Sequence, residues 1–377
     1  MSAQPVPIQR APARVLFIDN LRILLTALVI LHHLAIGYGS AGDWYYDENG
    51  PITTLSTILL TLFVAINQSF FMGFFLLIGS YMIPGSLARK EAARFVLDRL
   101  KRLGIPILLY TFVLSPVLIA ILRADRGQPF DLFQAPGFGL GPMWFVETLL
   151  IFSLGYVAWH TFAPRTLTPR AINAPGNFVI ALFAFVLGVI TFVVRIWFPI
   201  GWWLEPIHLQ IAHFPQYIAL FVIGIIAFQR DWFNTLGNTS RRVWLWSALT
   251  LAPAFLAIGI AGGALEGNLD AFTGGVHWQS FVTAIWEQVM GIAVIITLLV
   301  SFRERLNRQN NLAQTLAADA YAVFTFHPLV IVPLALAFRD IAIEMGVKFI
   351  FIAPLAVIAC FIVGHTIRKI PGAQKIF

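Results

Sequence analysis

The sequence predicts an all-α, polytopic membrane protein with about ten transmembrane helices and both termini in the cytoplasm. Composition gives the class. Hydrophobic residues make up 59% of the 377 residues and charged residues only 11%, whereas a soluble globular domain carries about 25% charged residues. The mean hydropathy is +0.81, and the apolar residues fall in segments of about 20, the length of helix that crosses a bilayer.

Ten such segments follow one another along the chain. They cover residues 16–38, 55–83, 103–122, 143–162, 177–197, 207–228, 243–262, 279–301, 316–338 and 346–367. The first is too long for the apolar core of a signal peptide and contains charged and imidazole side chains, so we predict an uncleaved helix behind a polar tail, residues 1–14. The connections are short, which predicts a single membrane domain over residues 1–377.

The distribution of Lys and Arg predicts the orientation in the membrane. With the N-terminus inside, nineteen of the 25 basic residues fall in the termini and loops on the cytoplasmic side and four in the outer loops, while Arg22 and Arg195 lie within helices. This asymmetry predicts that both termini are cytoplasmic in a multi-pass protein of the inner (plasma) membrane. The net charge of +7 then mostly reflects topology, so the bilayer is an expected partner and nucleic acid is not.

Several kinds of chemistry have no pattern in this chain. The one cysteine, Cys360, excludes an intrachain disulfide. There is no HExxH motif, no paired-cysteine metal pattern and no serine nucleophile elbow. We therefore expect neither a metal nor a permanently bound cofactor.

The first apolar segment carries a polar stripe. Arg22 and His33 are eleven residues apart, which on a helix is three turns plus about 20° and about 16 Å along the axis. Both side chains should point the same way, and ionisable groups inside a membrane usually have a function. Arg22 also lies three residues after Asp19, so an ion pair within the helix is expected, and this pair is compatible with phosphate binding.

His33 is the candidate catalytic base. It should lie about 25 Å from the cytoplasmic end of its helix, and Glu147 enters the membrane from outside to a depth of about 6 Å, so the two can share one level. A carboxylate beside an imidazole raises its basicity and fixes its tautomer. The alternative for His33 is a packing hydrogen bond to a neighbouring helix. His32 lies 100° around the helix and either lines the acceptor site or has a structural role.

A basic stretch precedes the third apolar segment, in 89-RKEAARFVLDRLKRLG-104. One interpretation is an amphipathic surface that meets anionic lipid. The other is phosphate binding, because Arg99 and Arg102 lie three residues apart on one helix face and Arg22 lies on the same side of the membrane.

The remaining intramembrane polar residues are candidates for substrate binding. His327, followed by Pro328, lies in the middle of the ninth segment, where function and interhelical packing are both open. Arg195, His213 and Glu287 lie towards the outer side and predict a polar acceptor pocket.

Several stretches resemble one family in its order along the chain. They are FIDNLRILLTALVILHH, FFMGFFLLIGSYM, DRLKRLGIPILLY, GPMWFVETLLIFSLGY and AYAVFTFHPLV. Together they resemble the acyltransferase-3 family of integral membrane enzymes over residues 16–370. The family's Arg-x10-His motif matches Arg22 and His33, and its Arg-x-x-Arg motif matches Arg99 and Arg102. Within the family, the sequence most resembles those of members implicated in succinylating periplasmic glucans.

The resemblance implies an acyl-coenzyme A donor on the cytoplasmic side and a hydroxyl of a saccharide or other small acceptor on the outer side. In that interpretation Arg22, Arg99 and Arg102 hold the phosphates, and His33 is the general base or is transiently acylated. The acyl group, acetyl or succinyl, stays open. The rival from another class is a saccharide or lipid transporter, which also needs a polar path through the membrane; inverted repeats would favour it, and no convincing pair is present.

Overall fold

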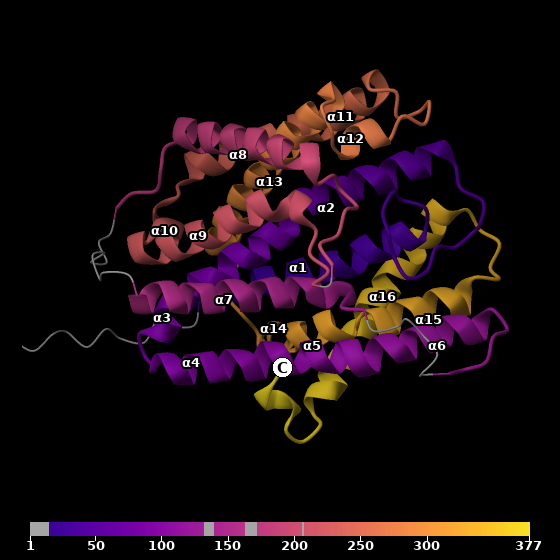
Figure 1. The fold of residues 1–377 in the computed structure, drawn as a ribbon, viewed down its shortest axis with the longest axis horizontal. Helices are drawn as coiled ribbons and strands as arrows, with labels where there is room; N and C mark the ends of the chain where they lie inside the picture. Colours follow the sequence, from indigo (N-terminus) through magenta and orange to yellow (C-terminus); the bar gives the residue numbers. More distant parts are fainter. Residues whose placement is uncertain (1–14, 132–138, 163–171, 206) are drawn as a thin grey trace, which may run out of the picture.

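A computed structural model describes residues 15–131, 139–162, 172–205 and 207–377, which form an elongated bundle of helices (Figure 1). The predicted tail, residues 1–14, lies outside the described residues. Within the described ranges the only β pairing is one isolated antiparallel bridge between Leu204 and Leu209.

The helices of the first half are α1 (Leu16–Gly37), α2 (Thr54–Tyr81), α3 (Ile83–Leu87), α4 (Ala92–Arg99), η1 (Leu100–Gly104), α5 (Ile105–Leu109), η2 (Tyr110–Leu114), α6 (Ser115–Asp125), η3 (Gly141–Met143), α7 (Trp144–Phe162) and α8 (Asn177–Trp197). Those of the second half are η4 (Ile211–His213), α9 (Phe214–Arg230), α10 (Trp232–Thr235), α11 (Asn238–Ala261), α12 (Asp270–Thr273), α13 (Trp278–Arg305), α14 (Asn311–Phe326), α15 (Pro328–Phe338), α16 (Met345–Arg368) and η5 (Ala373–Lys375).

The structure confirms the predicted all-α membrane class. Within the described residues, nine helices are long and apolar enough to cross a membrane, and the bent pair of α14 and α15 brings the number to ten if it is one span. The spans follow the ten predicted segments in order. The cytoplasmic placement of both termini and the single-domain organisation stay predictions.

The third span begins earlier than its apolar segment. The prediction placed it at residues 103–122, but the helix is continuous from Ala92 to Asp125 and includes two π-helical turns, η1 and η2. The basic stretch is therefore the first part of this span. It is helical because it is amphipathic: Phe95 is buried while Arg94 is exposed.

The ninth segment is bent at His327. Helix α14 ends at Phe326, α15 begins at Pro328, and the two axes differ by 69°. A proline inside a helix removes one backbone hydrogen bond and its ring clashes with the preceding turn. The bend at Pro328 follows from this, and it leaves the backbone carbonyl of Phe324 without its helical donor, which matters for the site.

The core of the bundle lies around α1, α2 and α13 (Figure 1). In each of these helices more than half of the most apolar stretch is buried. Only 6% of the corresponding stretch of α11 is buried, as expected of a helix that faces lipid. Around this core, the start of α1, the start of the third span and the end of α16 contribute basic residues to one cavity. We call this the basic end of the bundle, and the other the opposite end.

Candidate functional site

A cavity of about 660 Å³ opens among α1, α2, α4, α7 and α14 at the basic end. Its volume is in the range of small-molecule sites. Six cationic side chains line it: Arg22, Arg89, Lys90, Arg99, Arg102 and Arg368. Two carboxylates also line it, Asp19 and Asp98. The excess of positive charge makes this cavity a candidate site for a polyanion.

The three arginines singled out by their spacing in the sequence all line this cavity. The Arg99 guanidinium lies over the ring of Phe95, 5.0 Å from its centroid, and its charge is repelled by those of Arg102 and Arg22. Arg22 Nη1 bonds Asp19 Oδ1 at 3.3 Å, the expected pair within the helix. Like charges held together in this way are stabilised when an anion binds between them.

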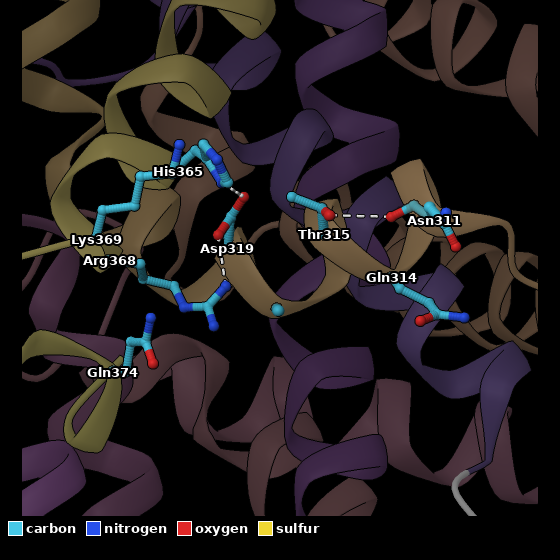
Figure 2. A pocket seen from close by; sticks show the side chains of 9 residues that line it. Asn311, Gln314, Thr315, Asp319, His365, Arg368, Lys369 and Gln374 are labelled. Carbon is cyan, nitrogen blue, oxygen red and sulfur yellow. Dashed lines mark hydrogen bonds and ion pairs between the residues drawn. The ribbon is translucent and has the colours of Figure 1, made fainter.

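A side pocket of about 450 Å³ adjoins the cavity and shares Ala318, Arg368 and Gln374 with it. Figure 2 shows its polar lining from α14 and α16. The buried carboxylate of Asp319 accepts a hydrogen bond from Arg368 at 2.6 Å and contacts His365 Nδ1 at 2.9 Å. The side pocket thus adds polar, hydrogen-bonding space beside the arginine-lined cavity.

A pair of histidines lies beyond the inner end of the cavity. His33 Nδ1 of α1 is 3.0 Å from His327 Nε2, and their rings are stacked with centroids 5.1 Å apart. His327 is fully buried. Its Nδ1 is 2.7 Å from the carbonyl oxygen of Phe324. The bend in the ninth segment therefore directs an imidazole onto the polar stripe of α1.

The partners of this pair determine where its protons lie. A helical carbonyl normally accepts from the N–H four residues later, but for Phe324 that residue is Pro328, which has none. The carbonyl can only accept, so His327 Nδ1 carries a proton and donates it. Neutral His327 then has a lone pair on Nε2, and His33 Nδ1 must be the donor to it. Neutral His33 then has its proton on Nδ1 and an unprotonated Nε2, the form that a general base requires.

The partner of His33 is not the one that the sequence predicted. Glu147 does not bond His33 in the described structure: its Oε2 is buried without a hydrogen-bond partner, and its carboxylate interacts electrostatically with His208. Two residues earlier on the same helix, Phe145 lines the cavity. The depth estimate was insufficient because α7 turns Glu147 away from α1. The prediction that Glu147 orients His33 is therefore wrong, and His327 occupies that position.

The connection between α1 and α2 covers His33 from the opposite end. The ring of Trp44 stacks on the ring of His33 with centroids 3.8 Å apart and planes 13° apart. Tyr45 Oη and Tyr110 Oη are 3.0 Å apart, and Glu48 forms a buried ion pair with Lys348 of α16. A cavity of only about 10 Å³ remains beside His33, Trp44 and Tyr46, which is room for about one water.

Trp44 was not among the predicted site residues. Its only signal was an aromatic run, Trp44-Tyr45-Tyr46, in a predicted polar loop. His32, in contrast, points away from the pair and packs on Phe71 with ring centroids 4.8 Å apart. Its Nδ1 is buried and has no hydrogen-bond partner among the described residues.

The predicted acceptor residues separate into two groups. His327 joins His33, whereas Arg195, His213 and Glu287 form a buried charge cluster between α8, η4 and α13. Arg195 Nη2 is 2.7 Å from Glu287 Oε2 and 3.2 Å from His213 Nδ1. The three residues line neither the basic-end cavities nor the narrow cavity beside His33.

Replacement of Glu287 by alanine is expected to destabilise the protein by about 3–5 kcal/mol, because Arg195 would be left as a buried charge without its counter-ion. Thermal unfolding of the purified protein in detergent measures the change. Glu287→Gln, which keeps hydrogen-bonding atoms, should lie between the wild type and Glu287→Ala. An unchanged unfolding temperature in Glu287→Ala would contradict a stabilising role for the cluster.

The chain was also compared with known proteins. No curated protein and no solved structure matches it. The family model described as an acyltransferase domain matches residues 15–365. This range includes the cavity-lining arginines of α1 and of the third span together with both histidines of the pair. The chain therefore belongs to the acyltransferase-3 family of membrane acyltransferases.

Proposed function

We propose that this protein is a membrane O-acyltransferase that moves an acetyl or succinyl group from cytoplasmic acyl-coenzyme A to a hydroxyl of a saccharide or other small acceptor on the outer side of the plasma membrane. One observation carries the proposal: a cavity rich in arginine ends next to the pair of His33 and His327, in which neutral His33 has an unprotonated Nε2. Phe324 links the two, because it lines the cavity and its carbonyl fixes His327.

In this proposal the coenzyme enters from the basic end, which the positive-inside rule assigns to the cytoplasm. Arg22, Arg99 and Arg102 hold its phosphates through charge-assisted hydrogen bonds. The polar side pocket offers room for the nucleotide. The thioester arm then extends along α1 towards His33, about 16 Å from Arg22 along the helix axis.

His33 Nε2 acts as the general base in the proposed reaction. It removes the proton of the acceptor hydroxyl while the oxygen attacks the thioester carbonyl. The C–S bond breaks, the new C–O ester bond remains, and the proton passes from His33 to the departing thiolate. His33 Nδ1–H donates to His327 throughout, which holds the ring in one tautomer and disperses the charge of the transient imidazolium.

The acceptor is proposed to approach from the opposite end, past Trp44 and Tyr46. These residues line the narrow cavity beside His33, and an aromatic ring stacked on the catalytic imidazole is a surface on which a sugar ring can lie. The cavity has room for about one water, so the acceptor must displace Trp44. The charge cluster of Arg195, His213 and Glu287 has a structural explanation and is not needed for this route.

Removal of both motif arginines tests the donor assignment. Arg99→Gln/Arg102→Gln is expected to raise the KM for acyl-coenzyme A at least about tenfold, since a hydrogen bond to a charged group contributes about 1.5–3 kcal/mol. Binding contacts far from the reacting atoms act mainly on KM, so kcat should change less. Release of labelled acyl groups to water and to added glucan or other saccharide measures both constants.

Arg94→Gln is the matched control, because Arg94 is on the same helix but exposed and outside the cavity lining. It removes the same charge and should leave KM unchanged. Equal effects of Arg94→Gln and the double variant would point to general surface charge instead of phosphate binding. If folded wild-type protein turns over no acyl-coenzyme A but moves a saccharide or lipid across vesicles, the transporter replaces this proposal.

A further inference from the structure

Three phenylalanine rings from three different helices meet at the inner end of the basic-end cavity. Phe75 of α2, Phe145 of α7 and Phe324 of α14 have pairwise centroid distances of 5.6, 5.8 and 6.2 Å. We call this group the phenyl collar. Tilted and edge-on contacts at these distances are favourable. Phe145 and Phe324 are almost completely buried, at 6% and 5% exposure. The collar therefore forms a tightly packed, apolar part of the cavity wall.

The phenyl collar separates the arginines from the histidines. All three rings line the cavity, whereas neither His33 nor His327 is among its described lining residues. The Phe324 ring contacts His327 on the far side, with centroids 6.0 Å apart. On α1, Thr26 lines the cavity, and His33 lies seven residues further, about 10 Å along the axis. A group that travels from the arginines along α1 to His33 passes beside these rings.

No described residue gives this passage a positive charge to accompany an anion. Among the described lining residues, the cations are the six named above, and the innermost of them on α1, Arg22, lies one turn before Thr26. Beyond the collar lie His33 and His327, where loss of water disfavours a charge on either imidazole. A carboxylate at the end of an acyl chain would leave the arginines and lose its water against three phenyl rings, which is costly without a partner.

We propose that the phenyl collar selects the acyl group, admitting short uncharged acyl chains to His33 and rejecting dicarboxylic ones such as succinyl. This inference rests on the proposed function and restricts the acyl group of its donor to short uncharged chains. It assigns the cationic residues of the cavity to the phosphates of the coenzyme, not to a second carboxylate on the acyl group. Phe75, Phe145 and Phe324 are then specificity-determining residues.

The test compares donors that match in size but differ in charge. Full-length protein is assayed with acetyl-, butyryl-, succinyl- and octanoyl-coenzyme A, and label release gives kcat and KM for each. Butyryl and succinyl have similar lengths, so their ratio isolates the carboxylate. We expect kcat/KM for succinyl to be about 100-fold below that for butyryl, from the cost of a carboxylate at membrane depth. Octanoyl should react poorly because the collar is tightly packed.

Phe145→Ala opens the collar. It should raise kcat/KM for octanoyl-coenzyme A relative to that for acetyl-coenzyme A at least about tenfold, because a buried phenyl ring is replaced by space. The ratio of kcat/KM for butyryl to kcat/KM for succinyl should fall, because water can enter the opened collar. Phe75→Leu is the milder second variant, since Phe75 is only partly buried. Phe152→Ala is the matched control on α7: Phe152 packs on Phe221 and Phe214, away from the cavity, so it should not alter donor selectivity.

The outcomes distinguish this inference from the proposed function. If no donor is turned over by folded wild type, the proposed function fails. If the wild type has equal kcat/KM for succinyl and butyryl, the collar does not select the acyl group. The same conclusion follows if Phe145→Ala and Phe152→Ala both keep the donor selectivity of the wild type. In either case acyl transfer itself stands.

Discussion

His33→Ala is expected to abolish measurable acyl transfer, a loss of about 10²–10⁴-fold, which is the contribution of a positioned general base. The physical reason is the tautomer. The bonds from His33 Nδ1 to His327 and from His327 Nδ1 to Phe324 leave His33 Nε2 as the basic atom of the pair. The KM for acyl-coenzyme A should change little, because the arginines that bind the phosphates are untouched. Steady-state kinetics with labelled donor measures both constants.

His160→Ala is the control for His33→Ala. His160 is exposed near the end of α7 and lines none of the described cavities. It should retain wild-type kinetics, which excludes a general effect of losing a histidine. Retained transfer in folded His33→Ala would overturn both the general-base mechanism and the acyl-histidine mechanism.

A quenched reaction without acceptor separates the two mechanisms. Label on the wild-type protein at short reaction times, absent from His33→Ala, supports a transiently acylated His33 and a reaction in two steps. No label on the protein, with transfer as soon as acceptor is added, supports direct attack by the acceptor hydroxyl. The same protein preparations serve both measurements.

The fold was predictable because the bilayer imposes one simple rule on length and polarity. Each apolar segment of about 20 residues became a helix, since backbone groups in lipid must bond within the segment. The errors lie where this rule gives no information. The third span extends back to Ala92 because a basic amphipathic helix can continue out of the apolar layer, and hydropathy alone does not detect that part.

The two motifs within single helices were also predictable. Arg99 and Arg102 share a helix face by their spacing, and they meet Arg22 at the basic end. The pairing of His33 with His327, which are 294 residues apart, was not. Sequence gives the depth of a residue on its own helix, but not which helices are neighbours or which way each is rotated. Glu147 was chosen on depth and is turned away from His33.

Trp44 and Phe324 were missed for a related reason. Trp44 reaches His33 because a connecting loop folds back into the bundle, and loop paths follow from tertiary contacts such as the ion pair between Glu48 and Lys348. Phe324 acts through its backbone carbonyl. The sequence did contain one signal for it, because Pro328 lies four residues later and removes that carbonyl's helical donor.

His327→Leu is expected to lower kcat about 10²–10⁴-fold while the KM for acyl-coenzyme A changes little. Leucine cannot accept the proton of His33 Nδ1, so the ring is free to adopt the tautomer in which Nε2 carries the proton and cannot act as a base. A wrong tautomer costs about 10⁴-fold in kcat in the Ser-His-Asp triad, where a carboxylate occupies the orienting position. A neutral orienting imidazole should contribute less, so the lower half of the range is expected.

The conservative variant tests positioning against packing. The side-chain carbonyl of His327→Gln can accept from His33 Nδ1, so this variant should recover at least about tenfold of the loss, as a replaced hydrogen bond to a charge-bearing group would. Pro328→Ala supplies the backbone N–H that competes with His327 for the Phe324 carbonyl, and it should lower kcat in the same direction by a smaller factor. Equal kcat in His327→Leu and His327→Gln, at equal thermal stability, would show that His327 only fills space. A graded series, with His327→Leu below His327→Gln and Pro328→Ala nearest the wild type, is expected if the hydrogen bonds from His33 to His327 and from His327 to the Phe324 carbonyl hold His33 in the basic tautomer.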